Sequence, residues 1–264
     1  MATAIPPLQE SEKIEFGDIK PKGVSEADSI VVASYNIRYA VGQFLISSGL
    51  LRKAGLHGSR GRTELVAKNI HIAARTFAAG NVDVLALQEA DKRTARAGGH
   101  HVARELAEEL EMTWVHLPAG IPRGIKPQTR QWWLDFEEPI DLHDPGDTGV
   151  ALLSRLPIND VKRIDLPWHA CAWRPRLAMG ATISAGGHEL RVYNAHVDPH
   201  AAVGGQLEQL ETLVAEANSN SGPTLILGDF NTLSKKKVLE TRKFLESEET
   251  RLRPIIEELG LVRK

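Results

Sequence analysis

The chain contains, near its middle, the stretch Gly149-Val-Ala-Leu-Leu-Ser-Arg-Leu-Pro-Ile158, in which an apolar run is followed by a Leu-Pro turn signal. A short apolar run bounded by turn residues is typical of a buried strand. Similar runs at 161–166, 176–184 and 189–197 predict three more strands, and Gly186-Gly187 predicts a tight turn between the last two. Consecutive strands joined by short turns pair antiparallel. The middle of the chain is therefore expected to form an antiparallel sheet.

Strands and helices alternate on both sides of this region. Buried strands are predicted at 30–36, 82–88, 112–117 and 224–227. Amphipathic helices are predicted at 63–79, 100–111 and 206–217, and a mixed-charge helix at 234–260. In the helix at 206–217, the predicted buried stripe is Leu207, Leu210, Val214 and Ala217. The fold class is therefore expected to be α/β (α+β).

The domain is expected to begin near Ser29. Residues 1–28 are rich in Pro, Glu and Lys and show no periodicity, which predicts a mobile N-terminal tail. We expect a single domain over residues 29–264.

The composition is that of an ordinary globular protein. The 264 residues are 42% hydrophobic and 25% charged, which supports a sizeable core and argues against a disordered chain. Lys and Arg number 32 against 34 Asp and Glu, so the net charge of -2 provides no overall positive field for a polyanion. No apolar run reaches the roughly 18 residues that a membrane span needs, and we expect no stable membrane insertion.

Cys171 is the single cysteine, which rules out an internal disulfide and favours a reducing, cytoplasmic location. Its neighbour His169 could act as the base for a cysteine nucleophile, although such a pair is a common coincidence. Zinc-ligand spacing, His-Glu-x-x-His, the Walker glycine loop and Gly-x-Ser-x-Gly are absent from the sequence. The sequence therefore argues against zinc enzymes, P-loop enzymes and serine hydrolases.

Polar residues follow the apolar runs at four strand ends, where rigid elements hold side chains in place. They are Glu89 after the run at 84–88 and three sets that each share one face: Asn36 with Arg38, Asn194 with His196 and Asp198, and Asp229 with Asn231. Any one set could be the solvated face of an antiparallel sheet. The four together indicate a functional site.

A carboxylate among amide oxygens suits Mg²⁺, which keeps several waters and shares its remaining ligands with a substrate phosphate. Glu89 is the natural ligand. We expect Mg²⁺ as the cofactor, with Mn²⁺ able to substitute.

Five motifs resemble those of a known family. They are Ser-Tyr-Asn-Ile-Arg at 34–38, Leu-Gln-Glu at 87–89, the stretch at 149–158, Asn-Ala-His-Val-Asp at 194–198 and Gly-Asp-Phe-Asn-Thr at 228–232. In this order the motifs resemble the endonuclease/exonuclease/phosphatase superfamily, which has the deoxyribonuclease I-like fold. The resemblance implies a four-layer αββα sandwich of two mostly antiparallel sheets. It also implies metal-assisted hydrolysis of a phosphate ester at one edge of the sheets.

The resemblance further implies a role for each polar strand end. Glu89 would bind Mg²⁺ with help from Asn36. Asp229 would orient or deprotonate the attacking water, while His196 and Asn231 would hydrogen-bond the scissile phosphate. Supporting roles would fall to Arg38, Asn194 and Asp198.

Residues 232–264 depart from the family pattern because they contain no Asp and no His. The family carries there a late Asp and a Ser-Asp-His signature that serve catalysis. We therefore expect a C-terminally incomplete domain without its last strands, marginally stable and with a sheet edge open to self-association or to a completing chain. The alternative is a catalytically impaired or dead member that acts as a phosphate-ligand binding or scaffold domain.

The motifs leave the substrate open among nucleic acid, phospholipid and small phosphodiesters. Residues 118–148 carry basic and aromatic side chains suited to stack on a base, lie at a lipid interface or pack on the sandwich: Arg123, Lys126, Arg130, Trp132 and Trp133. Acidic residues after them disfavour a simple groove for a phosphate backbone. In the next loop, Arg174 and Arg176 could contact phosphate or form a structural pair.

Overall fold

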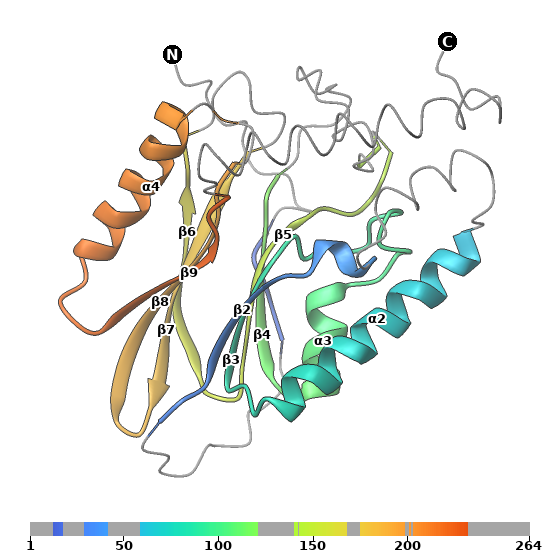
Figure 1. The fold of residues 1–264 in the computed structure, drawn as a ribbon, viewed down its shortest axis with the longest axis horizontal. Helices are drawn as coiled ribbons and strands as arrows, with labels where there is room; N and C mark the ends of the chain where they lie inside the picture. Colours follow the sequence, from blue (N-terminus) through green and yellow to red (C-terminus); the bar gives the residue numbers. More distant parts are fainter. Residues whose placement is uncertain are drawn as a thin grey trace, which may run out of the picture.

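The structure, a computed structural model, describes residues 13–17, 29–41, 59–120, 140–141, 143–167, 175–198, 201 and 203–231. Within these ranges, two sheets stack face to face (Figure 1). Helices α2 (Ser59–Ala79) and α3 (Val102–Leu110) cover the outer face of one sheet, and α4 (Val203–Asn218) covers the outer face of the other. This arrangement is the four-layer αββα sandwich that the family resemblance implies.

The two sheets differ in strand number but share one feature of pairing. The first has the order β1 (Glu15–Phe16), β4 (Thr113–Pro118), β5 (Gly149–Ser154), β3 (Val84–Gln88), β2 (Val32–Asn36). The second has the order β6 (Ile158–Asp165), β7 (Leu177–Ala185), β8 (His188–His196), β9 (Thr224–Asp229). Each sheet is antiparallel except for one parallel pair, β2 with β3 and β8 with β9.

Alternation along the strands separates three apolar layers. Leu85 and Leu87 of β3 belong to the layer beneath α2 and α3. Val84 and Ala86 of the same strand belong to the layer between the sheets. Tyr193 of β8 belongs to the third layer, beneath α4. A strand buried on both faces is apolar throughout, which explains the unbroken run at 84–87.

The two parallel pairs bring polar strand ends to one edge of the sandwich. Asn36 lies opposite Gln88, and His196 lies opposite Asp229. Parallel strands end at the same edge of a sheet, so the ends of β2 and β3 lie together, as do the ends of β8 and β9. A hydrogen bond from Asn36 to Asp229 brings the two pairs of ends together.

Strand β1 lies in the stretch that we expected to be a mobile tail. Glu15 and Phe16 extend the first sheet by pairing with β4. The Glu15 carboxylate also accepts hydrogen bonds from Lys92 Nζ and His101 Nε2, each at 2.9 Å. The ordered fold therefore includes residues before Ser29, held by backbone pairing and by a carboxylate with two partners.

Other elements lie close to their predicted positions. Helix α2 begins at Ser59 rather than at 63. Strand β6 begins at Ile158 rather than at 161, and a register shift between Asn159 and Lys162 interrupts its pairing with β7. The predicted helix at 234–260 lies outside the described residues. No helix in the described ranges is both long and apolar enough to cross a membrane.

The Glu15 contacts predict an acid-sensitive contribution to stability. Burial raises the pKa of Glu15, but hydrogen bonds and positive charge from Lys92 and His101 outweigh it and lower the pKa from 4.5 to about 2. A carboxyl whose pKa is lower in the folded state stabilises the fold above pH 4.5, and this contribution is lost as the pH falls through 2. We expect Glu15→Gln to reduce the free energy of unfolding by about 1.5–3 kcal/mol at pH 7 and by much less near pH ~2.5, measured by urea denaturation. Glu211→Gln, at an exposed position of α4, should change neither value, and an equal deficit of Glu15→Gln at both pH values would contradict this account.

Candidate active site

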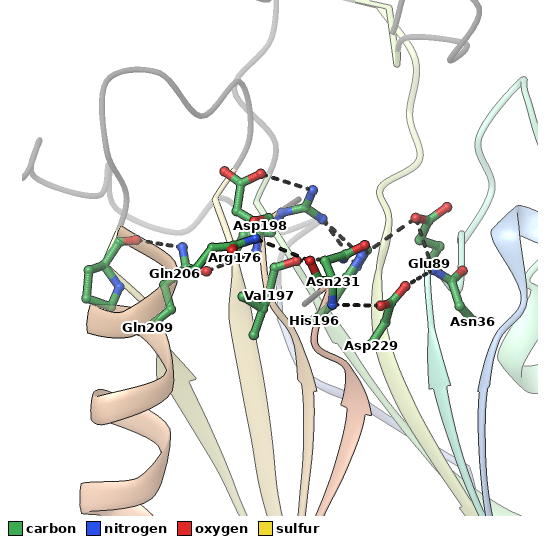
Figure 2. Close-up of polar contacts among 11 residues, drawn as sticks. Asn36, Glu89, Arg176, His196, Val197, Asp198, Gln206, Gln209, Asp229 and Asn231 are labelled. Atoms are coloured by element: carbon green, nitrogen blue, oxygen red, sulfur yellow. Dashed lines mark hydrogen bonds and ion pairs between the residues drawn. The ribbon is translucent and has the colours of Figure 1, made fainter. Parts of the chain in front are cut away.

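Asn36 joins the two sheets at their common edge. Its side-chain Nδ2 donates to Glu89 Oε1 at 3.2 Å and to Asp229 Oδ2 at 2.9 Å (Figure 2). Glu89 directly follows β3 of the first sheet, and Asp229 ends β9 of the second. One amide therefore holds two carboxylates together, although Asn36 and Asp229 are 193 positions apart in the sequence.

Arg38 does not take its predicted place beside Asn36. Strand β2 ends at Asn36, and Arg38, Tyr39 and Ala40 form a left-handed turn, η2 (Arg38–Ala40), with φ of 46°, 44° and 59°. The backbone N–H of Arg38 donates to Asn36 Oδ1 at 3.1 Å, while the residue itself is exposed. Alternation ends with the strand, so Arg38 supports Asn36 through its backbone.

Glu89 lies in a left-handed backbone conformation with φ of 53°, which is uncommon for a residue other than glycine. Backbone hydrogen bonds hold this turn: Tyr39 N–H donates to the Glu89 carbonyl at 2.9 Å, and Ala90 N–H donates to the Gly149 carbonyl at 3.0 Å. His116 Nε2 donates to the Ala90 carbonyl at 2.7 Å, and burial lowers the pKa of His116 to about 3, so the imidazole stays neutral. These contacts fix the direction of the Glu89 carboxylate.

Asp229 and Asn231 form a second rigid turn after β9. The Asn231 N–H donates to Asp229 Oδ1 at 3.0 Å, and Asn231 has a φ of 49°. The Asn231 side-chain Nδ2 donates to the Val197 carbonyl at 2.8 Å. Both carboxylate oxygens of Asp229 thus accept hydrogen bonds, one from Asn231 and one from Asn36.

His196 lies between Glu89 and a buried arginine (Figure 2). Its Nε2 is 3.7 Å from Glu89 Oε1. Arg176 Nη1 is 3.2 Å from His196 Nδ1, and Arg176 Nη2 is 3.7 Å from Asp198 Oδ1. A guanidinium has only donors, so the imidazole nitrogen that it contacts acts as the acceptor. Two basic groups, His196 and Arg176, therefore lie side by side between the carboxylates of Glu89 and Asp198.

Asn194 lies below the site, between the sheets. Gln88 Nε2 donates to Asn194 Oδ1 at 2.7 Å, and Asn194 Nδ2 donates to the carbonyls of Leu87 and Ala151. Both side chains are fully buried. Gln88 was not among the residues expected at the site, although a glutamine at the end of a buried apolar run is itself a signal of a specific hydrogen bond.

A shallow pocket opens beside His196 and Arg176. It is lined by Ala119, Thr148, Gly149, Val150, Pro175, Arg176, Leu177 and His196. The guanidinium of Arg176 is buried here, with its side chain 3% exposed. The pocket therefore offers an anion a cationic wall next to the imidazole.

The carboxylates of Glu89 and Asp229 are oxygen donors of the kind that suits a hard divalent cation. In the described part of the chain, no group of three or more His, Cys, Asp or Glu residues is placed to hold a metal. Glu89 and Asp229 instead present carboxylates on either side of the Asn36 amide. Mg²⁺ typically takes only a few protein ligands, all of them oxygen atoms, and completes its coordination shell with water and substrate oxygens.

Several residues selected from the sequence lie outside the described residues. They are Arg123, Lys126, Arg130, Trp132, Trp133, His169, Cys171 and Arg174. Most of the described residues of the predicted site bring their side chains to one edge of the sandwich. Arg38 instead contacts Asn36 through its backbone N–H, and Asn194 lies beneath the site, between the sheets.

Residues 33–240 match the family model of the Endonuclease/Exonuclease/phosphatase family. The chain belongs to this family. Its members are phosphoester hydrolases, and the family that the motifs indicate is confirmed. No curated protein matches the chain in sequence.

Solved structures share the fold at low identity. The endonuclease/exonuclease/phosphatase from Beutenbergia cavernae DSM 12333 is 18% identical, with a TM-score of 0.50 over 78% of this chain and 49% of that one. A family protein from Leptotrichia buccalis C-1013-b is 19% identical, with a TM-score of 0.48 over 83% of this chain and 74% of that one. A mannosyl-6-phosphatase from Bacteroides thetaiotaomicron VPI-5482 is 17% identical, with a TM-score of 0.48 over 78% and 67%. The chain spans about half the length of the Beutenbergia protein.

Gly228 is required by the close approach of β9 to β8. Its φ is 144°, and a Cβ at this position would lie 2.1 Å from the Ala195 carbonyl oxygen. We expect Gly228→Ala to reduce the free energy of unfolding by about 3 kcal/mol or more, because strain and overpacking add. Gly222→Ala, where the nearest atom lies 3.7 Å away, should be close to neutral in the same urea titration. Similar stability of the two variants would contradict the close-approach argument.

Proposed function

We propose that this chain is a divalent-metal-dependent phosphoesterase that hydrolyses a phosphodiester. The observation that carries the proposal is the pair of carboxylates, Glu89 and Asp229, held 3.2 Å and 2.9 Å from one Asn36 amide nitrogen. His196 and a buried arginine lie beside this pair. Groups suited to bind a metal, to act as a base and to donate to a phosphate thus lie next to one another at one edge of the sandwich.

The charge balance of the site supports metal dependence. Among the residues that the structure describes, Glu89, Asp198 and Asp229 place three carboxylates around His196 and Arg176. Carboxylates repel an approaching phosphate. A divalent cation bound to Glu89, and to Asn36 once its amide turns its oxygen in place of Nδ2 toward the carboxylates, would neutralise negative charge there and stabilise the charge that develops on the phosphate oxygens.

Asp229 fits the role of the base that orients or deprotonates water. Hydrogen bonds from Asn36 and Asn231 fix both of its carboxylate oxygens, and each oxygen keeps a second lone pair for a water molecule. A general base must reach the proton that it takes within hydrogen-bond distance. The rigid turn after β9 supplies that orientation without rearrangement.

His196, Asn231 and Arg176 fit the role of phosphate-binding groups. His196 and Arg176 line the shallow pocket, and Arg176 is held in place by Asp198. Asn231 uses one hydrogen of its side-chain amide to bind Val197, which leaves the second hydrogen for a phosphate oxygen. Donors aimed in advance at such oxygens provide much of the electrostatic part of catalysis.

Hydrolysis of bis(p-nitrophenyl) phosphate tests the proposal. We expect turnover with Mg²⁺ or Mn²⁺ and none in EDTA. Asp229→Asn and Glu89→Gln should each lower kcat/KM by about 10²–10⁴-fold, because each removes a charged group that acts on the reacting atoms. Glu211→Gln, at an exposed position of α4, serves as the control and should leave kcat/KM unchanged.

Two results would contradict the proposal. Turnover that persists in EDTA would exclude metal dependence, and full activity in both variants would exclude the assigned site. Absent turnover together with retained binding of inorganic phosphate would instead favour a phosphate-binding domain. Active protein should next be assayed with DNA, RNA and phospholipid to identify the substrate class.

Asn36→Asp tests the metal site independently of turnover. The variant would place a third carboxylate between Glu89 and Asp229 and would remove both donated hydrogen bonds. In EDTA we expect the free energy of unfolding to fall by about 1–3 kcal/mol. Saturating Mg²⁺ should reduce this deficit, because the third carboxylate makes the variant bind the cation more tightly than wild type does, and tighter binding to the folded state stabilises it more.

Asn159→Asp provides the matched control for this experiment. Asn159 is exposed and lies near the start of β6, away from the carboxylates of the site. Its side chain donates one hydrogen bond, to Ser184 Oγ. Its stability should respond to Mg²⁺ as wild type does. If Mg²⁺ stabilises neither wild type nor Asn36→Asp, no cation binds between the carboxylates, and the proposed metal site is contradicted.

A further inference from the structure

Helix α4 buries a glutamine where the sequence pattern predicts a leucine stripe. Leu207 and Val214 were expected to be buried, yet they are 52% and 46% exposed. Gln209 is instead 0% exposed and Leu213 1%. Burial of an amide in preference to two apolar side chains requires compensating hydrogen bonds. The helix is therefore oriented by polar contacts as well as by apolar packing.

Gln209 uses both ends of its amide on the backbone beside the site. Its Oε1 accepts from the Asp198 N–H at 2.9 Å, and its Nε2 donates to the Pro167 carbonyl at 2.9 Å. Asp198 follows β8 by two residues, and Pro167 follows β6 by two residues. The single side chain thus ties the ends of two strands to the helix.

Gln206 lies one helical turn earlier, on the same face of α4. Its Nε2 donates to the Asp198 carbonyl at 2.8 Å and to the Asn231 carbonyl at 3.4 Å (Figure 2). The segment after β8 and the turn after β9 therefore share one donor. Together with Gln209, this contact holds Asp198 at both its backbone N–H and its carbonyl.

We propose that Gln206 and Gln209 are positioning residues that hold the His196 and Asn231 side chains in their reactive places. Asp198 reaches His196 through Arg176, and Asn231 is joined to Asp229. Among the described residues, the last backbone pairing after β8 is the bond from Val197 N–H to the Asp229 carbonyl at 2.9 Å. At Asp198, the next residue, the two glutamines bind the backbone N–H and carbonyl instead. The inference rests on the function proposed above. A displacement of about 1 Å at a catalytic group can lower a rate by about 100-fold.

The test compares Gln206→Met and Gln209→Met, which keep side-chain length and remove the hydrogen bonds. We expect kcat for bis(p-nitrophenyl) phosphate with Mg²⁺ to fall by about 10–100-fold in each variant. The change in KM should be smaller than the change in kcat, because His196 and Asn231 stay near the phosphate but lose the alignment that the transition state needs. The imidazole NMR signals of His196, assigned by their loss in His196→Gln, should shift in both variants.

Leu213→Ala is the matched control for a merely structural role. Leu213 is buried on the same helix face and contacts none of these backbone groups through a hydrogen bond. The substitution weakens the docking of α4 by creating a cavity. At a temperature well below its unfolding midpoint, it should keep the wild-type kcat and the wild-type His196 signals. Glu211→Met, at an exposed position, should behave in the same way.

The outcomes separate this inference from the proposed function. If wild type hydrolyses the substrate, a wild-type kcat or unshifted His196 signals in Gln206→Met overturns the inference, as does an equal loss of kcat in Leu213→Ala. If wild type shows no metal-dependent hydrolysis, the proposed function fails, and the His196 signals alone decide whether the glutamines hold the imidazole. Gln206 is only partly buried, so Gln206→Met decides the question even if Gln209→Met does not fold.

Discussion

The buried hydrogen bonds of Gln88 and Asn194 hold the two sheets in a single alignment. Gln88 donates to Asn194 at 2.7 Å, and Asn194 in turn donates to carbonyls of β3 and β5. Apolar packing tolerates small displacements between sheets, whereas a displacement here leaves buried amides without partners at a cost of about 1–3 kcal/mol each. Glu89 follows Gln88, and His196 lies two residues beyond Asn194. The same bonds therefore set the position of the site's two sides.

Several strained backbone positions lie around this site. Residues 38–40, Glu89 and Asn231 all have positive φ, and Gly228 adds a conformation that only glycine adopts readily. Each strained position adjoins a hydrogen-bonded anchor, such as the His116 imidazole behind Glu89. Sharp turns of this kind redirect the chain immediately after a strand, so that carboxylates and amides converge on one point. The surrounding hydrogen bonds offset the cost of the strain.

Much of the fold could be predicted from apolar runs and turn residues. Strand β5 occupies the residues predicted for it, and Glu89, His196 and Asp229 were selected because they end apolar runs. One prediction failed because the alternation of a strand was extended past the end of that strand, as at Arg38. Another failed because tertiary hydrogen bonds, and not the spacing of apolar residues, decided which face of a helix is buried. The buried face of α4 is the clearest case, since its sequence favours Leu207 while its contacts bury Gln209. Strand β1 was missed because two residues carry no detectable period.

By itself, the sequence determined the family, the alternation of strands and helices, and the chemistry available at each strand end, because these depend on neighbouring residues. Only the tertiary structure decided which of those ends meet. Asn36 contacts Asp229 across 193 positions, and no local pattern encodes that contact. Gln88 and Gln209 likewise acquire their roles from distant backbone groups. The physical reason is that a buried polar side chain is placed by the partners that satisfy it, and those partners come together only when the sheets and helices pack.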